Sequence, residues 1–261
     1  MPDDGAPESA LAPAEDALRS SSFGTVAEVY DRYRPTFPPE ALAWALGDPA
    51  LEVLDLGAGT GLMTQVLVDL GHQVVAVEPD DAMRHQIPGR APDAICHAGS
   101  AEAIPLPDAS EDAVVAAESY HWFDKPRALP EIARVLRPQG RLVIVWNVSD
   151  ESVTWVKDFH ALLQSVNPAP RGGTGRAVSP EPWFTVSEDR RFPHAHTTDA
   201  DGLVGMAATW SPIIVSPRRD EVLDSIRTFA TTHPDLAGRS SFDVPYLTRV
   251  VVCRVADHAP A

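Results

Sequence analysis

Four residues form the pattern D-x-G-x-G-x-G, and these are Asp55, Gly57, Gly59 and Gly61. Glycine lets a backbone turn sharply and approach a ligand without an intervening Cβ atom. The apolar run 51–56 before the glycines predicts a buried parallel strand, and residues 62–70 after them have apolar residues at helical spacing. A strand, a glycine loop and a helix in this order are typical of the opening unit of a nucleotide-binding α/β domain.

The spacing of the glycines separates the kinds of ligand that such a loop could bind. A dinucleotide fingerprint needs G-x-G-x-x-G, but Leu62 stands at the last glycine position, and no lysine is present for a phosphate-binding P-loop. The pattern instead resembles the first motif of class I S-adenosylmethionine (SAM)-dependent methyltransferases. The resemblance implies that Asp55 lies close to the ammonium group of SAM. It also implies that the loop contacts the methionine part of SAM through Gly57, Ala58, Gly59 and Gly61.

Residues 73–78 predict a second buried strand that ends in Glu78, 17 residues after Gly61 (78 − 61). A carboxylate at the end of this strand can accept hydrogen bonds from both ribose hydroxyls of an adenosine ligand. Glu78 therefore indicates adenosine without choosing between NAD and SAM. The resemblance places Pro79 and Met83, in a short helix that follows, near the adenine.

A third strand is predicted at residues 94–98, followed by a polar loop with a proline stop. This loop resembles the adenine-binding loop of the methyltransferase family, in which an A-E-x-[IL]-P pattern follows the third strand. The resemblance implies contacts to the adenine ring and its amino group from Ser100, Ala101 and Glu102.

A fourth strand, 113–117, is followed by Glu118 and by the string Tyr-His-Trp-Phe-Asp at 120–124. Because ligands of open α/β sheets bind beyond the carboxyl ends of the strands, we expect this segment to face the transferable methyl group and Glu118 to contact the cofactor. The string resembles a signature of a subgroup that includes small-acid carboxyl methyltransferases. His121 is the candidate catalytic base, since imidazole titrates near neutrality, and a role in orientation or packing is the alternative.

The segment before the first predicted core helix contains Tyr-Asp-Arg-Tyr-Arg-Pro at 30–35. It resembles the N-terminal segment of the same subgroup, in which tyrosines and the last arginine fold over SAM. The resemblance implies that Tyr30, Tyr33 and Arg34 contact the cofactor, and the planar fork of Arg34 suits the methionine carboxylate. The alternative is an amphipathic helix whose tyrosines pack on the sheet.

The predicted fold is a Rossmann-like, seven-stranded, mostly parallel sheet with helices on both faces and a substrate-cap insertion. Residues 1–21 are rich in Ala, Pro, Ser and acidic residues, and we expect a disordered tail. Residues 22–147 are expected to form the SAM-binding core with an N-terminal lid helix, and 148–240 a cap with C-terminal helices. Residues 241–261 are expected to form a closing strand and tail. Within 22–147 a turn is predicted at 137–140, and within 148–240 a loop at 167–182 is a candidate lid.

Composition limits the partners and the location that we expect. Lysine and arginine number 21 and aspartate and glutamate 37, which gives a net charge of −16 and argues against a nucleic-acid partner. No apolar run is long enough to span a membrane, and the acidic N-terminus does not resemble a signal peptide, so we expect a cytoplasmic protein. We expect no metal site, and the pair His194 and His196 is interpreted as an exposed polar face of a strand.

The favoured hypothesis is therefore a SAM-dependent methyltransferase that methylates a small molecule, most readily on oxygen, by in-line displacement at the methyl group. A methyltransferase acting on protein or RNA is one alternative. A SAM-binding protein without methyl transfer is another, and a nicotinamide oxidoreductase is disfavoured by the glycine spacing. The sequence does not predict the oligomeric state.

Overall fold

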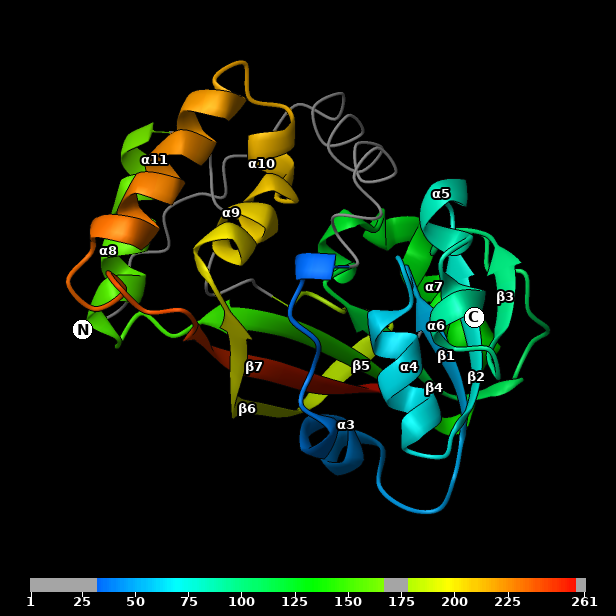
Figure 1. Cartoon of the computed structure of the whole chain (residues 1–261). Helices are drawn as coiled ribbons and strands as arrows, with labels where there is room; N and C mark the ends of the chain where they lie inside the picture. Colours follow the sequence, from blue (N-terminus) through cyan, green and yellow to red (C-terminus); the bar gives the residue numbers. More distant parts are fainter. Residues whose placement is uncertain (1–31, 167–177, 257–261) are drawn as a thin grey trace.

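The computed structural model describes residues 32–166 and 178–256 and contains one mixed sheet, helices on its two faces and a separate group of helices (Figure 1). The seven strands are β1 (Glu52–Leu56), β2 (Gln73–Glu78), β3 (Ile95–Ala98), β4 (Glu111–Ala117), β5 (Leu136–Ser149), β6 (Phe184–Thr198) and β7 (Phe242–Val255). Their order in the sheet is β3-β2-β1-β4-β5-β7-β6. Strands β1 to β5 pair in parallel, and β7 pairs antiparallel with both β5 and β6. The predicted seven-stranded, mostly parallel sheet is thereby confirmed.

Helices cover both faces of the parallel part of the sheet. The helical elements in this half are α3 (Pro39–Leu46), α4 (Leu62–Asp69), α5 (Asp81–Arg84), α6 (Ile87–Arg90), η2 (Tyr120–Trp122) and α7 (Lys125–Val135). Apolar residues of α3 and α4 pack on one face, and those of α7 pack on the other. Alternate residues of β4 divide between the two faces, with Ala113 and Val115 toward α3 and α4 and Val114 and Ala116 toward α7. This double burial explains why the central strands are almost uniformly apolar.

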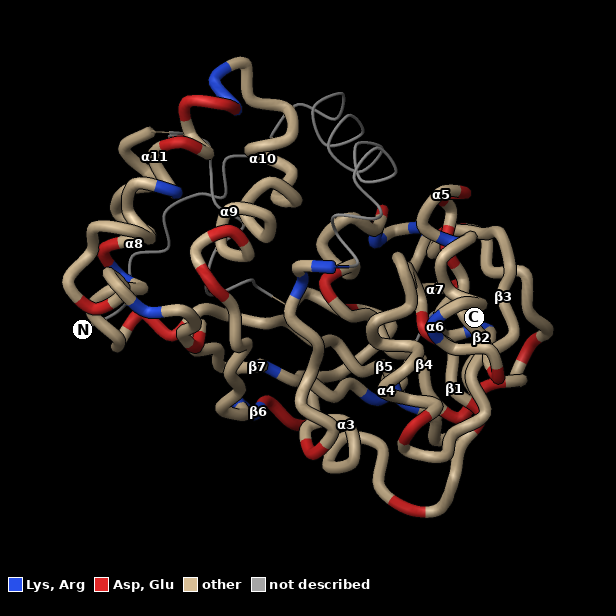
Figure 2. The backbone as a smooth tube through the Cα atoms, in the orientation of Figure 1, with Lys and Arg blue, Asp and Glu red and all other residues tan. Residues whose placement is uncertain are grey.

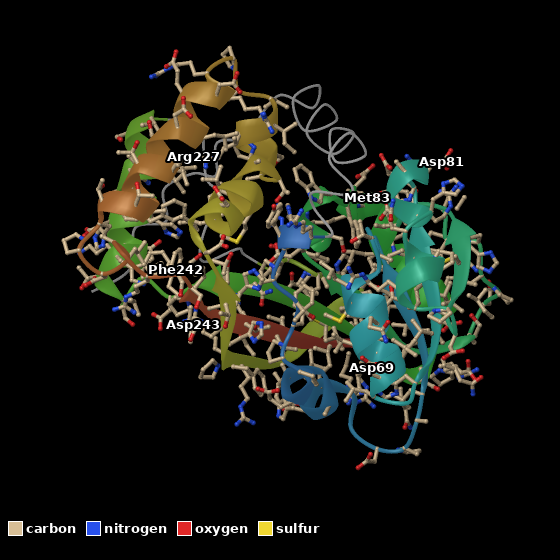
Figure 3. The ribbon with its side chains drawn as sticks, in the orientation of Figure 1. Asp69, Asp81, Met83, Arg227, Phe242 and Asp243 are labelled. Carbon is tan, nitrogen blue, oxygen red and sulfur yellow. The ribbon has the colours of Figure 1, made fainter. Side chains whose placement is uncertain are left out.

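A second group of helices follows β5 and consists of α8 (Thr154–Val166), α9 (Ala200–Ala208), α10 (Ser211–Ile214) and α11 (Arg219–Thr232), here called the helical cap. Figure 1 shows these helices gathered on one side of the molecule, away from α4, α5 and α6. They share an apolar core of their own, in which the Trp155 and Phe242 rings lie 5.7 Å apart. Arg227 of α11 forms an ion pair with Asp201 of α9, and Figure 3 labels this arginine on the cap surface. Packing and charge therefore hold the cap together as one unit.

Acidic and basic side chains are distributed over both the helical cap and the sheet domain. Figure 2 shows acidic segments on the cap helices, on α5 and on the loops around α3 and β3. The net charge of −16 is thus not confined to one terminal segment.

The structure differs from the sequence prediction at residues 137–140, which were expected to form a turn. They belong to β5, whose register against β4 shifts between the pairs Glu111–Leu136 and Ala113–Arg141. Gln139 has a positive φ of 69°, so this stretch of β5 is an irregular, bulged segment. Pro138 cannot donate a hydrogen bond to the ladder, which is consistent with a bulge at this place.

Several predictions concern residues outside the described ranges. They are the disordered tail at 1–21, Tyr30 and most of the predicted lid helix, and positions 167–177 of the candidate lid loop. The predicted segment 148–240 contains β6 as well as the cap helices, so it supplies one edge strand of the sheet.

Candidate active site

A cavity of about 420 Å³ lies at the carboxyl ends of β1, β2, β4 and β5 and extends to the helical cap. Many of the residues predicted to bind the cofactor line it. These are Arg34, Asp55, Gly57, Ala58, Gly59, Glu78, Pro79, Met83, Ser100, Ala101, Glu102 and Glu118. The location agrees with the rule that ligands of open α/β sheets bind beyond the carboxyl ends of the strands.

The glycine loop takes a backbone conformation that other residues rarely adopt. Gly57, Gly59 and Gly61 all have positive φ values, of 72°, 58° and 88°. A Cβ atom on Gly57 would lie 2.6 Å from Cβ of Ser119, so only glycine fits between β1 and the segment after β4. Gly61 is the N-cap residue of α4 and does not line the cavity. Its role is therefore to allow the backbone conformation of the loop.

Asp55, the last residue but one of β1, is a carboxylate almost completely removed from water. Its side chain is 1 % exposed, and Oδ2 accepts a hydrogen bond of 2.6 Å from the Thr64 hydroxyl. Burial is the largest influence and raises the pKa of Asp55 to about 7. The hydrogen bond from Thr64 lowers this pKa, and the charge of the neighbouring Glu78 raises it. Oδ1 is buried and has no hydrogen-bond partner among the described residues. A buried acid with an unpaired oxygen beside a cavity suits a positively charged group of a ligand.

Glu78, at the end of β2, is held at the cavity wall by two backbone groups. Oε2 accepts from the Gly59 N–H at 2.8 Å, and Oε1 accepts from the Asp80 N–H at 2.8 Å. The carboxylate thus joins the glycine loop to the start of α5. Burial raises the pKa of Glu78, while these two hydrogen bonds oppose the rise. Each oxygen retains a second lone pair, as acceptance from the hydroxyls of a ribose requires.

The loops after β2 and β3 complete this side of the cavity. Asp80 caps α5 by accepting from the Met83 N–H at 3.0 Å, and this cap positions Met83 against the cavity (Figure 3). Glu102 accepts from the Asp124 N–H at 2.9 Å, which links the loop after β3 to the start of α7. The predicted adenine-contacting residues are therefore brought together on one wall.

The N-terminal segment reaches across to the helical cap. Arg34 lines the cavity, and its guanidinium donates from Nε to Oγ1 of Thr209 at 2.8 Å and from Nη2 to the Thr209 carbonyl at 3.0 Å. Tyr33 does not line the cavity. Its ring lies against Gly205 of α9, where an added Cβ would approach it to 2.5 Å.

The segment after β4 contains a residue with a strained backbone. Glu118 has a φ of 54°, a left-handed conformation that costs a non-glycine residue free energy and is found preferentially at functional sites. Its N–H donates to the Val145 carbonyl at 2.9 Å, and Oε1 accepts from the Asn147 N–H at 2.7 Å. These bonds fix the Glu118 carboxylate at the junction of β4 and β5, in the cavity wall.

Comparison with known proteins identifies the family. The protein family described as "Methyltransferase domain" matches residues 54–144 of this chain. An uncharacterized methyltransferase of Mycobacterium tuberculosis is 41 % identical over 239 residues, which cover 91 % of this chain and 97 % of that protein. The chain belongs to the class I SAM-dependent methyltransferases. An uncharacterized methyltransferase of Schizosaccharomyces pombe is 33 % identical over 172 residues, covering 64 % of this chain and 68 % of that protein.

Solved structures agree with this assignment. A proposed type II methyltransferase from Anaeromyxobacter dehalogenans superposes with a TM-score of 0.66 at 26 % identity, covering 88 % of this chain and 100 % of that one. The [4+2]-cyclase SpnF shares the fold alone, with a TM-score of 0.52 at 14 % identity, covering 94 % of this chain and 98 % of that one. Membership in the family implies SAM as the methyl donor.

His121 of the methyltransferase does not line the cavity, although its neighbours Trp122 and Phe123 do. The residue lies in η2, and its ring lies against the Trp122 ring, with centroids 4.6 Å apart and an angle of 41° between the ring planes. The segment that the sequence singled out lines the cavity through Trp122 and Phe123, whereas His121 of the same short helical turn does not line it. Of the two roles open from the sequence, the geometry favours packing or orientation.

Most of the wall on the cap side was not found from the sequence, although Trp210 is one of several tryptophans that the sequence offers for an apolar pocket. It contains Asn147 and Ser149 of β5, Met206 of α9, Trp210 between α9 and α10, and Tyr246 of β7. The Tyr246 hydroxyl donates to Sδ of Met206 at 3.2 Å, and burial raises the pKa of this phenol. No local motif marks these residues, because they come from separate elements that meet only in the folded chain. Asn147 had a signal in its position near the end of a parallel strand, and Trp210 had one in its aromatic side chain.

The histidine pair on β6 does not form a second functional site among the described residues. His194 and His196 lie on one side of β6 and are half-buried, in contrast to the exposed face expected, and His194 lies near Thr36 and Glu40. In residues 32–166 and 178–256, no group of three or more metal-ligating side chains is present. No helix in the same ranges is long and apolar enough to cross a membrane.

Proposed function

We propose that the methyltransferase binds SAM in the cavity at the carboxyl ends of its strands and methylates a small molecule there, on an oxygen atom. The observation that supports this proposal is the composition of the cavity wall. Glycine-loop and acidic residues of the sheet line one side, and aromatic, thioether and amide residues near the cap line the other. A volume of about 420 Å³ is in the range of small-molecule sites.

The residues on the sheet side fit the groups of SAM. Asp55 offers a buried, unpaired carboxylate oxygen to the ammonium, and Glu78 offers its carboxylate to the ribose hydroxyls. The open space at Gly59, where an added Cβ would come no nearer than 3.9 Å to Met83, admits a ligand against the backbone. Bound SAM supplies a methyl group on a sulfonium, which is already a strong electrophile.

The protein's own contribution is then alignment and the exclusion of water. Trp210, Met206 and Tyr246 supply an apolar surface for the acceptor, and Ser149 supplies a group that can bond a hydroxyl. A small acceptor held between this surface and the sheet can approach the methyl group in line. A polymer would need an open surface in place of the cap.

The test combines binding with product analysis. Calorimetric titration with SAM should give 1:1 binding that Glu78→Ala weakens at least tenfold, whereas the exposed Glu188→Ala control should leave it unchanged. Methyl-labelled SAM is then incubated with the enzyme and a cell extract separated by size. Label in a low-molecular-weight product is the expected result, and label in protein or RNA would overturn the small-molecule assignment.

A further inference from the structure

The sheet order divides the cavity into two halves. Strands β2 and β1, with the loop after β3, supply the acidic and glycine residues assigned above to SAM, whereas β5, β7 and the helical cap supply the opposite half. Strand β4 lies between β1 and β5. A side chain that projects into the cavity from the end of β4 therefore lies at the boundary between donor and acceptor. Glu118 occupies this place.

The charged side chains of the cavity wall are predominantly acidic. Carboxylates at the wall belong to Asp55, Glu78, Asp80, Glu102 and Glu118. Among the described lining residues, Arg34 has the one positive side chain, and two of its nitrogens bond Thr209. SAM carries a sulfonium, an ammonium and a carboxylate, so its net charge of +1 does not neutralise this wall.

Glu118 belongs to the acceptor half by its contacts. Its Oε1 accepts from the backbone of Asn147, a residue of that half. The pKa of the Tyr246 phenol is raised mainly by burial. The charge of Arg34 lowers this pKa, and the charge of Glu118 raises it, so Glu118 lies close enough to act on Tyr246. The carboxylate is thus directed toward the cap side by a strained backbone and a fixed hydrogen bond.

We propose that Glu118 faces the nucleophile of the acceptor and selects a neutral hydroxyl over a carboxylate. This inference rests on the proposed function and narrows its substrate class. It also departs from the small-acid methyltransferases that the Tyr-His-Trp-Phe-Asp string resembles, whose acceptor is an anion.

Electrostatics and proton balance both favour such an acceptor. A carboxylate acceptor beside Glu118 would place two negative charges together in a poorly solvated cavity, which is unfavourable. A hydroxyl can instead donate a hydrogen bond to Glu118. On methyl transfer its O–H bond breaks and the proton passes to the Glu118 carboxylate. The new bond to carbon forms as the carbon–sulfur bond breaks, with that electron pair remaining on sulfur.

The first test is the chemical stability of the label. Methyl esters release volatile labelled methanol in mild alkali, whereas methyl ethers and N-methyl groups keep their label. We expect the low-molecular-weight product formed in the extract to be alkali-stable. An alkali-labile small product would overturn this inference and leave small-molecule O-methylation intact. Label in protein or RNA would overturn the proposed function itself, and the inference with it.

The second test is the charge-neutral variant Glu118→Gln, assayed with the purified small-molecule fraction of the extract. We expect turnover to fall about 100-fold, since a positioned base contributes about this much, while SAM affinity and melting temperature stay near those of the wild type. The exposed Glu188→Gln serves as the matched control and should keep full turnover. Unchanged or faster turnover in Glu118→Gln would show that the acceptor is an anion or does not interact with this carboxylate. Either result would overturn the inference.

Discussion

Arg34 and Thr209 connect the two parts of the methyltransferase that enclose the cavity. The guanidinium donates to the Thr209 hydroxyl at 2.8 Å and to its carbonyl at 3.0 Å, although the two residues are 175 positions apart in the chain. Thr209 is the C-cap of α9 and is fully buried, and its hydroxyl donates in turn to the Met206 carbonyl at 2.6 Å. The segment before α3 is thereby joined to the C-terminal end of α9.

Loss of this connection should loosen the cap. We expect Thr209→Val to lower the free energy of unfolding by about 1–2 kcal/mol, because it leaves buried partners of the hydroxyl without a hydrogen bond. Urea unfolding measures this change. Thr231→Val is the matched control, since the Thr231 hydroxyl is exposed and donates to its own helix at Arg227. Equal effects of the two variants would contradict a connecting role for Thr209.

The raised pKa of Asp55 should make the stability of the free protein depend on pH. The pKa is about 7 in the folded state, against 3.8 as the ordinary value, so between these pH values the folded chain holds a proton that the unfolded chain has lost. Unfolding then releases a proton, and stability falls as pH rises from about 4 to about 7, by up to about 1.4 kcal/mol per pH unit, and is level above that.

The variant Asp55→Asn isolates this contribution. Urea unfolding at pH 5, 6, 7 and 8 should show that the difference in stability, wild type minus variant, decreases toward pH 7 and then stays constant. SAM affinity of the wild type should increase over the same interval, because a positive ligand group favours the ionised carboxylate. A difference in stability that does not change with pH would exclude the raised pKa.

The close approach at Gly57 predicts a large effect of a single methyl group. We expect Gly57→Ala to destabilise the protein by more than about 2 kcal/mol, because a positive φ and a contact of 2.6 Å with Ser119 act together. Gly71→Ala is the control, since Gly71 has a φ of 86° and no atom within 4 Å of the added Cβ. Thermal unfolding compares the two. Similar melting temperatures for Gly57→Ala and Gly71→Ala would mean that β1 and the segment around Ser119 can move apart without a loss of stability.

His121 should be dispensable for proton transfer. Because its ring lies against the Trp122 ring and does not line the cavity, we expect His121→Asn to keep turnover within about tenfold of the wild type. The pH profile of kcat should stay the same in shape. A loss of more than about 100-fold, with the low-pH limb removed from the profile, would restore His121 as the catalytic base in place of Glu118.

Much of the sheet domain was predictable because its signals are local. The glycine spacing after β1, the acid at the end of β2 and the apolar runs each depend on a few adjacent residues, whose conformations follow from short-range sterics and burial. The predicted strands that correspond to β1, β2, β3 and β4, and the cavity residues at the ends of β1, β2 and β4, accordingly reappear in the structure. The bulge at Gln139 escaped prediction, since proline and glycine at 138 and 140 are equally typical of a turn.

The sequence by itself determined the family, the fold class and the residues on the sheet side of the cavity, since these rest on motifs within single loops. The tertiary structure alone decided the cap side of the cavity. Asn147, Tyr246 and Trp210 are far apart in the chain and meet only because β7 pairs antiparallel with β5 while the cap closes over them. It also decided that Trp122 lines the cavity and His121 does not, because the direction of a side chain in a short helical turn depends on the packing around it.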